Sequence, residues 1–135
     1  MPSFSKKSLR ILNTVKEEDL KTLFKVVVKH FDCTITSGFR TVKEQQALYA
    51  KGRTKPGNIV TNADGVIHKS NHQSGLAVDV VPYPSLWSDR KKLREFGGFV
   101  LGVAAILKEQ GIIDIDVEWG GHWRFLDMPH FQVKQ

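Results

Sequence analysis

The sequence predicts an α+β fold, in which helices pack on a small and mostly antiparallel sheet. Three segments carry capping signals or apolar residues at helical spacing, and four short runs have the composition or alternation of strands. Their order along the chain is helix, strand, helix, long loop, strand, helix and two strands. A chain of 135 residues fits one domain with one core, so we expect a single domain over residues 1–135.

The first helix is predicted over residues 15–30. The pattern Thr14-Val-Lys-Glu17 matches a capping box. Apolar residues follow it at helical spacing: Leu20, Leu23, Phe24, Val27 and Val28. The run CTITS at 33–37 is rich in β-branched residues and predicts a short strand, which Gly38 ends.

A second capping box, Thr41-Val-Lys-Glu44, opens a helix that stops at Gly52. Residues 53–71 are then polar and show no strong periodicity. Loops of this length in compact domains are typically functional or disordered.

GLAVDVV at 75–81 reads as a buried strand, ended by Pro82 and Pro84. Ser88 is expected to cap a third helix over residues 89–110, which Gly111 stops. Its apolar positions form one stripe: Leu93, Phe96, Val100, Ala104 and Leu107.

Two strands are predicted at the end of the chain. IDVEW at 115–119 alternates as a strand does, with Glu118 on the face opposite Val117 and Trp119. A Gly-Gly turn follows, and HFQV at 130–133 completes the sheet.

The chain has a net charge of +6 and an isoelectric point near 9.6, which favours a polyanionic partner. Nucleic acid and an anionic cell wall are both partners of this kind. The basic residues are spread along the chain, and no RNA-binding signature or paired-cysteine finger is present. We therefore expect no nucleic-acid binding.

Neither a membrane segment nor a secretory leader is predicted. No apolar run approaches the roughly 20 residues of a membrane helix, and the N-terminal residues lack the apolar centre of a signal peptide. We expect synthesis in the cytoplasm and no insertion into a membrane. Cys33, the one cysteine, excludes an intramolecular disulfide and is expected in the core.

Asp79 raises the main chemical question, because it lies inside an apolar strand. A buried carboxylate is costly unless it is paired, hydrogen-bonded or bound to a metal. His72, seven residues earlier, leads into the same strand from a polar loop. Imidazole and carboxylate are both zinc ligands, so a metal site and a purely structural His–Asp hydrogen bond are both open.

A catalytic zinc site needs a third protein ligand and an open position for water. His130 is the best candidate, because it begins the last strand and Pro129 restricts the backbone before it. Asp127, three residues upstream, is then placed to act as a general base. Of the other histidines, His30 is expected at a helix end or on the surface, and His68 in solvent.

The motif Ser70-x-His72-x-x-Gly75-x-Ala77-x-Asp79, with Asp127-x-x-His130 much later, resembles a known zinc signature. It is that of the D-Ala-D-Ala carboxypeptidase and L-alanyl-D-glutamate peptidase family, the VanY/VanX-like, Hedgehog-related metallopeptidases that include phage endolysins and vancomycin-resistance dipeptidases. Further blocks resemble the same family in the same order: TSGFRT (36–41), EQQALYAKGRTKPGNIVTNA (44–63), WGGHW (119–123) and DMPHFQ (127–132).

The resemblance implies three zinc ligands, a base and two further site residues. The ligands are His72, Asp79 and His130. Asp127 corresponds to the acidic general base, which also protonates the leaving amine. Arg40 corresponds to the arginine that steadies the scissile carbonyl oxygen. Ser70 corresponds to a serine near the metal that contacts substrate or orients a ligand.

Four residues of the C-terminal blocks remain open. His122 stands where the family usually has aspartate in WGGDW, so no role is carried over to it. Glu118 is a rival to Asp127 as the base, and Asp127 is favoured. Trp119 and Trp123 are expected in the core rather than as substrate platforms.

The resemblance implies a zinc metallopeptidase that hydrolyses peptidoglycan stem peptides, with the L-Ala–D-Glu bond favoured, as in a phage or prophage endolysin. The alternatives are a D-Ala-D-Ala carboxypeptidase and a non-catalytic basic module that binds cell wall or nucleic acid, in which His72 and Asp79 are structural. We expect a monomer without a separate wall-binding domain, which waits in the host cytoplasm and reaches the wall through a holin-type release.

Overall fold

A computed structural model describes residues 1–84 and 88–135. In order, the elements are α1 (Lys6–Leu12), α2 (Glu18–His30), β1 (Cys33–Ser37), α3 (Val42–Ala50), β2 (Ala77–Pro82), α4 (Arg90–Glu109), β3 (Val117–Trp119), the 3₁₀ turn η1 (Gly120–His122) and β4 (His130–Val133). The strands form one antiparallel sheet in the order β1-β2-β4-β3. The predicted α+β class is confirmed. Within the described ranges, no helix combines the length and apolarity needed to cross a membrane.

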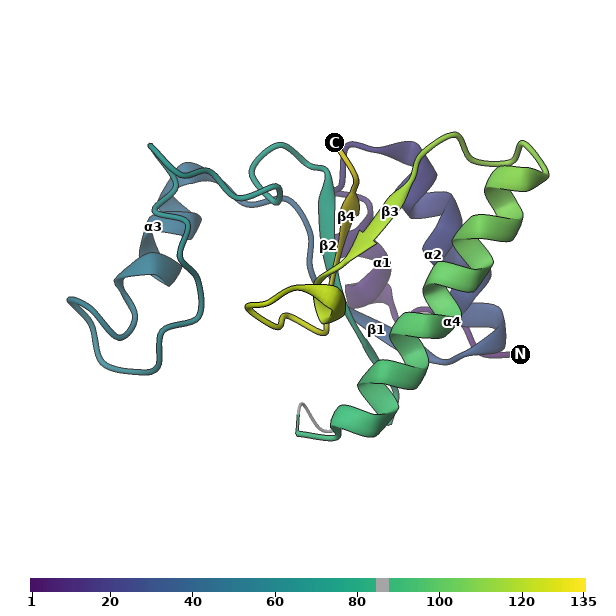
Figure 1. Ribbon diagram of the computed structural model, residues 1–135, viewed down its shortest axis with the longest axis horizontal. Helices are drawn as coiled ribbons and strands as arrows, with labels where there is room; N and C mark the ends of the chain where they lie inside the picture. The colour runs from purple at the N-terminus through teal and green to yellow at the C-terminus, as the bar shows by residue number, and fades with distance from the viewer. Residues whose placement is uncertain (85–87) are drawn as a thin grey trace.

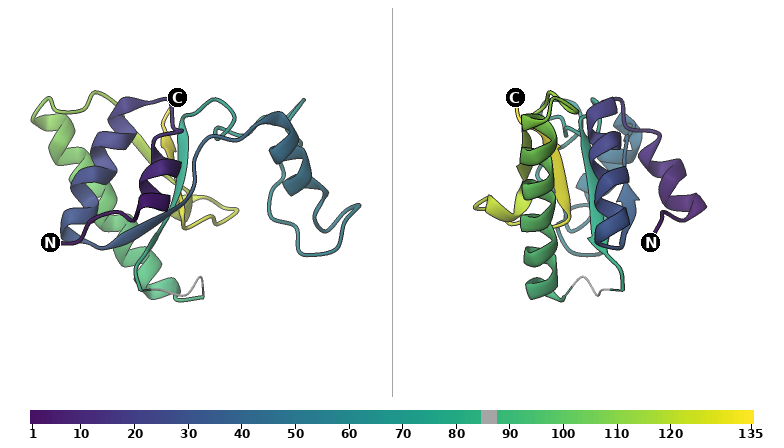
Figure 2. Two further views of the ribbon diagram at one scale, coloured as in Figure 1. Left: turned by 180° about the vertical axis from the view of Figure 1, so that it is seen from behind. Right: turned by 90° about the vertical axis from the view of Figure 1, so that its right-hand side faces the viewer.

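Two long helices, α2 and α4, lie side by side on one face of the sheet (Figures 1 and 2). The apolar stripes predicted for both helices are buried: Leu20, Leu23, Phe24, Val27 and Val28 in α2, and Leu93, Phe96, Val100, Ala104 and Leu107 in α4. Phe131 of β4 lies between them, edge-on to Phe24 and Phe96. Cys33 is buried in the same core, and burial raises the pKa of its thiol to about 12, so it is no nucleophile.

The opposite face of the sheet carries polar residues. Val78 and Phe131 pair across β2 and β4 on the core side, whereas the neighbouring pair, Asp79 and His130, points to the other side. Glu118 pairs with Gln132 in the same way across β3 and β4. The alternation of buried and polar residues therefore produces one apolar face and one face that can hold a site.

A short helix, α1, covers the outer edge of β1, although no helix is predicted before residue 15. The hydroxyl of Ser8 accepts a hydrogen bond from the backbone N–H of Ile35, at 3.1 Å. An uncovered edge strand would leave such groups free to pair with another chain. Only Ser8 and Leu12 are buried in this helix, so it lacks the apolar stripe by which a helix is recognised in sequence.

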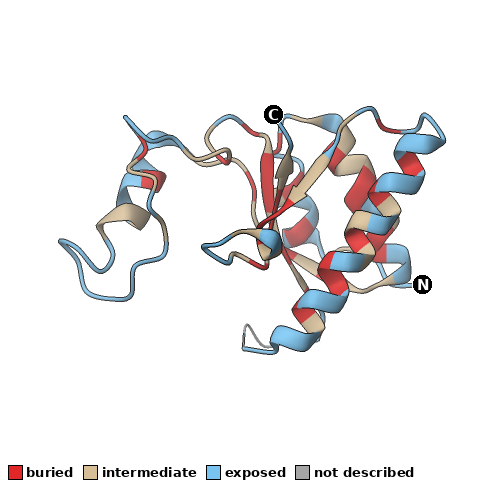
Figure 3. Ribbon diagram, viewed as in Figure 1, coloured by how far each residue is buried: buried red, intermediate tan, exposed pale blue. Residues whose placement is uncertain are grey.

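Residues 40–72 extend away from the core as an excursion that contains α3 (Figure 1). It is largely exposed (Figure 3) and is braced by polar contacts instead of a core. The buried side chain of Gln45 donates to the carbonyl of Ala63 at 3.0 Å. The guanidinium of Arg53 donates to the carbonyls of Tyr49 and Thr61 at 2.7 and 3.1 Å. The predicted long loop is thus confirmed, and it is held in place.

The capping box predicted at Thr14 is wrong. The helix α2 begins at Glu18, with Glu17 as its N-cap. The backbone N–H groups of Lys16 and Glu17 donate to the carbonyl of Gly75 instead, which keeps this segment out of the helix. The hydroxyl of Thr14 accepts from the N–H of Phe39.

The capping box at Thr41 and Glu44 is confirmed, with both reciprocal hydrogen bonds. At α4 the cap is Asp89, whose carboxylate accepts from the N–H of Lys92, and the predicted cap at Ser88 is one residue too early. Strands β2 and β3 each begin two residues later than predicted, and η1 replaces the predicted Gly-Gly turn.

The packing of α4 on the sheet can be tested by substituting two adjacent glycines of this helix, Gly97 and Gly98. A Cβ at Gly97 would lie 2.3 Å from the indole of Trp119, whereas a Cβ at Gly98 meets nothing within 4 Å. We expect Gly97→Ala to lower the free energy of unfolding by about 1–3 kcal/mol through overpacking. Gly98→Ala is the matched control and is expected to raise it by up to about 1 kcal/mol. Thermal or urea unfolding measures both, and equal effects would contradict the packing of Trp119.

Candidate metal centre

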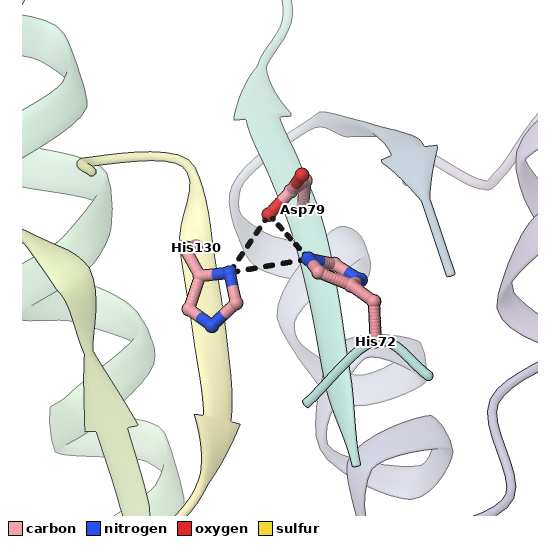
Figure 4. A group of neighbouring side chains, drawn as sticks. All are labelled: His72, Asp79 and His130. Atoms are coloured by element: carbon pink, nitrogen blue, oxygen red, sulfur yellow. Dashed lines mark hydrogen bonds and ion pairs between the residues drawn. The ribbon is translucent and has the colours of Figure 1, made fainter. Parts of the chain in front are cut away.

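Three residues meet at the polar face of the sheet, two from one short stretch of the sequence and His130 from the end of the chain (Figure 4). Asp79 of β2 and His130 of β4 are direct partners in the antiparallel register. His72 reaches them from the turn before β2. The hydroxyl of Ser70 accepts from the backbone N–H of His72 at 3.2 Å, and so helps to fix this turn. Both imidazoles are buried, and the side chain of Asp79 is 17% exposed.

The donor atoms of these residues form a nearly equilateral triangle. Nε2 of His72, Nδ1 of His130 and Oδ1 of Asp79 are 3.2 Å from one another in all three pairs. A regular tetrahedron with this edge has its centre about 2.0 Å from each corner, which is the bond length of zinc to imidazole and carboxylate ligands. Three protein ligands and one open corner are the arrangement of catalytic zinc sites.

Hydrogen bonds on the far side of each ring set which nitrogen carries a proton. Nδ1 of His72 lies 2.8 Å from the carbonyl of Gly38, which can only accept, so this nitrogen carries the hydrogen. Nε2 of His130 lies 2.8 Å from Oε1 of Gln132, and the Gln132 amide group donates to Glu118. In the neutral rings, the two nitrogens that face Asp79 therefore present lone pairs.

Three lone pairs that face one another repel unless a positive charge lies between them. A proton on His130 can supply that charge. Burial alone would lower the pKa of His130, but its contact with Asp79 outweighs burial and raises that pKa. Burial likewise acts to raise the pKa of Asp79, but hydrogen bonds to His130 and His72 hold it well below its usual range. A metal ion is the other such charge, and the donor set of two imidazoles and a carboxylate fits zinc.

Arg40 completes the charge balance around Asp79. Its Nη2 donates to Oδ2 of Asp79 at 3.2 Å, the oxygen that does not face the histidines. Its Nη1 donates to Oε1 of Gln45 in α3, and its backbone N–H donates to the carbonyl of His72. Arg40 therefore links Asp79 to the excursion, in addition to lining the cleft.

Gly75 of the motif is required by its surroundings. Its φ of +75° belongs to the left-handed region that favours glycine. A Cβ there would also lie 2.4 Å from Cγ of Lys16. The glycine thus allows the chain to turn from His72 into β2 beneath the segment that precedes α2.

The triangle lies at the floor of a cavity of about 450 Å³. The excursion forms one wall with Val60, Thr61 and Ala63, and Trp123 and Phe125 line the other. Of the residues implied by the resemblance, Arg40, Ser70, His72, Asp79, Asp127 and His130 all line this one cavity.

Asp127 stands beside the triangle without belonging to it. Its Oδ2 is 3.9 Å from Nδ1 of His130, and its side chain is 44% exposed. Burial and the nearby charge of Asp79 raise the pKa of Asp127, against the opposing charges of His130, His72 and Arg40. A carboxylate in this position can exchange a proton with a group bound at the open corner.

Glu118, the rival base, is engaged elsewhere. Its Oε1 accepts from Nε1 of Trp123 at 3.0 Å, and its Oε2 accepts from the amide of Gln132 at 3.2 Å. His122 is exposed, packs edge-on against Trp119, and is not among the cavity-lining residues. Asp127 is the better-placed carboxylate.

Two neighbours of His130, Trp123 and Gln132, were not identified from the sequence as site residues. Both tryptophans were expected in the core. Trp119 is buried there, but Trp123 is half-buried and forms a wall of the cleft. Its ring lies 5.0 Å from that of His130. Gln132 follows His130 by two residues, and the alternation of strand residues is the signal that could have placed it on the same face.

Several known proteins and protein families resemble this chain. Two family models, both described as D-alanyl-D-alanine carboxypeptidase, match the chain over residues 10–96 and 64–133. The peptidoglycan L-alanyl-D-glutamate endopeptidase CwlK of Bacillus subtilis (strain 168) is 41% identical over 111 residues. That match covers 78% of this chain and 62% of CwlK, so the chain spans less than two thirds of that relative's length.

A solved structure shares the fold. It is the crystal structure of the L-Ala D-Glu endopeptidase ChiX of Serratia marcescens, which is 22% identical to this chain, with a TM-score of 0.66. The match covers 98% of this chain and 91% of ChiX. The first family model spans most of the sequence from α1 to α4, and the second includes all three converging donor residues and Asp127. The chain belongs to the D-alanyl-D-alanine carboxypeptidase family of peptidases.

Proposed function

We propose that the chain is a zinc metallopeptidase that hydrolyses peptidoglycan stem peptides between L-Ala and D-Glu. The observation that carries this proposal is the convergence of three lone pairs, from His72, Asp79 and His130, at the floor of an open cleft. The names of CwlK and ChiX support the substrate class.

The chain's own residues supply the remaining chemistry. Bound zinc would polarise the scissile carbonyl and lower the pKa of a bound water to about 7. Asp127 is near enough to accept a proton at the open corner and to return it to the leaving amine. Arg40 uses two of its five N–H donors on Asp79 and Gln45, which leaves others to stabilise the carbonyl oxygen as it becomes negative.

The shape of the cleft favours an endopeptidase. A second hollow of about 880 Å³ shares Arg40, Leu48, Val60 and Asp79 with the first and continues beside β1. Both reactions need room for substrate on the amino side of the scissile bond. On the carboxyl side a carboxypeptidase needs room for one terminal residue, whereas an L-Ala–D-Glu endopeptidase needs room for D-Glu and the rest of the stem peptide. A cleft that continues into a second hollow offers that length.

The D-Ala-D-Ala carboxypeptidase reaction is the second candidate, because both matching family models bear that description. A non-catalytic wall-binding module is the third. The role in phage lysis, the release from a host cytoplasm, the monomeric state and the single-domain organisation stay predictions of the sequence.

The metal site is tested by removing one donor atom. We expect His72→Ala and Asp79→Asn to abolish tight zinc binding, and a chelator to abolish peptidoglycan hydrolysis until zinc is restored. Competition titration against a chromogenic chelator measures the affinity. His68→Ala, an exposed histidine of the same loop, is the control and should bind zinc as the wild type does. Undiminished zinc affinity in His72→Ala would refute the site.

The role of Asp127 is tested with Asp127→Asn, which keeps the shape of the side chain but cannot accept a proton. We expect zinc affinity to be retained and kcat on muropeptides to fall by about 10²-fold or more. Glu95→Gln, an exposed carboxylate on α4, makes the same charge change without contact to the cleft and should be neutral. Full activity in Asp127→Asn would exclude it as the base.

The bond is identified by mass spectrometry of purified peptidoglycan after digestion. New N-terminal D-Glu is expected, and it should not form in the presence of a chelator. Release of free D-Ala would establish the carboxypeptidase instead. If no new termini form while the protein still binds the wall, the chain is a binding module, and that binding should weaken as salt rises.

A further inference from the structure

Glu118 and Gln132 form a polar relay behind His130, on the side of the imidazole that faces away from the metal site. The two residues are direct partners across β3 and β4. The amide of Gln132 donates to Oε2 of Glu118 at 3.2 Å, and its carbonyl oxygen lies 2.8 Å from Nε2 of His130. Both side chains are partly buried.

We propose that Glu118 is a positioning residue which, through Gln132, holds His130 in the tautomer whose Nδ1 lone pair faces the metal. This inference rests on the zinc site of the proposed function. It assigns a role to Glu118 and Gln132, which lie next to the donor triangle and do not belong to it.

The direction of the relay follows from the chemistry of its members. An ionised carboxylate only accepts hydrogen bonds, so the amide of Gln132 must turn its NH₂ group toward Glu118. Its oxygen then faces His130 and requires a hydrogen on Nε2. With that nitrogen protonated, the neutral ring carries its lone pair on Nδ1, the atom 3.2 Å from both His72 and Asp79. Partners that fix ligand tautomers in this way commonly change metal affinity by about 10–100-fold when removed.

The carboxylate that begins the relay is itself held on both oxygens. Oε1 of Glu118 accepts from the indole N–H of Trp123 at 3.0 Å. This second contact prevents the carboxylate from rotating away from Gln132. It also keeps the Trp123 ring against His130, where the two ring centres are 5.0 Å apart.

Replacing Glu118 by glutamine exchanges the donors and acceptors along this hydrogen-bond chain without changing the size of the side chain. If the oxygen of the new amide keeps the Trp123 contact, its NH₂ group faces the NH₂ group of Gln132. The Gln132 amide then has to turn over and present NH₂ to His130. Nε2 of His130 becomes the acceptor, and the hydrogen moves to Nδ1, into the metal site.

The tautomer can be read directly by ¹⁵N NMR of the histidine side chains in metal-free protein, at alkaline pH where the ring is neutral. We expect the Nε2–H form of His130 in the wild type and a population of the Nδ1–H form in Glu118→Gln. In parallel, zinc affinity by competition titration should fall about tenfold or more. Asp116→Asn, an exposed carboxylate two residues earlier, is the matched control and should change neither measurement.

A second variant guards against a local packing defect. Gln132→Met removes the amide but keeps an unbranched chain of similar length, and it should lower zinc affinity by a similar factor. Because both residues act through one amide, the double variant should be no weaker than Gln132→Met alone. The Nε2–H tautomer and wild-type zinc affinity in both single variants would overturn the proposal. A wild type that shows the Nε2–H form but no zinc binding would instead refute the proposed function and leave the relay standing.

Discussion

The antiparallel pairing that sets Asp79 of β2 directly opposite His130 of β4 is the constraint on which the site depends. Directly opposite residues share a face of the sheet and bring their side chains close together. A slip of one residue would turn one of the two toward the core. The neighbouring pair, Val78 and Phe131, prevents such a slip, because Phe131 is packed between α2 and α4. The apolar core therefore determines the geometry of the polar site on the other face.

The same carboxylate connects the donor triangle to the walls of the cleft. One oxygen of Asp79 faces the two histidines and the other is bound by Arg40, which also holds Gln45 of α3. Removing one partner of a buried carboxylate strongly destabilises the folded protein. The position of the excursion and the charge balance of Asp79 are thus coupled through one arginine. Two of the three donors, Asp79 and His130, are fixed on the sheet, and one wall of the cleft lies on a segment without a core.

Behind the donors, a second set of contacts uses the same strand alternation. Gln132 follows His130 on the polar face, and Glu118 lies beside it on the next strand. One carboxylate thereby supports both Gln132, the partner of His130, and Trp123, a wall of the cleft. Gln132, Glu118 and two of the three donors all lie on neighbouring strands of one sheet, so backbone hydrogen bonds set their relative positions, whereas His72 joins them from the turn before β2.

Local patterns in the sequence determined the helices with clear apolar stripes, the capping box at Thr41, and the residue types of the donor set. These are local signals, because the residues that form each pattern lie close together in the sequence. The false capping box at Thr14 and the two neighbours of His130, Gln132 and Trp123, were decided only by the tertiary structure. At Thr14 a distant carbonyl takes the N–H groups that would begin a helix. The roles of the two neighbours depend on which strands lie side by side, and that follows from packing of the whole core.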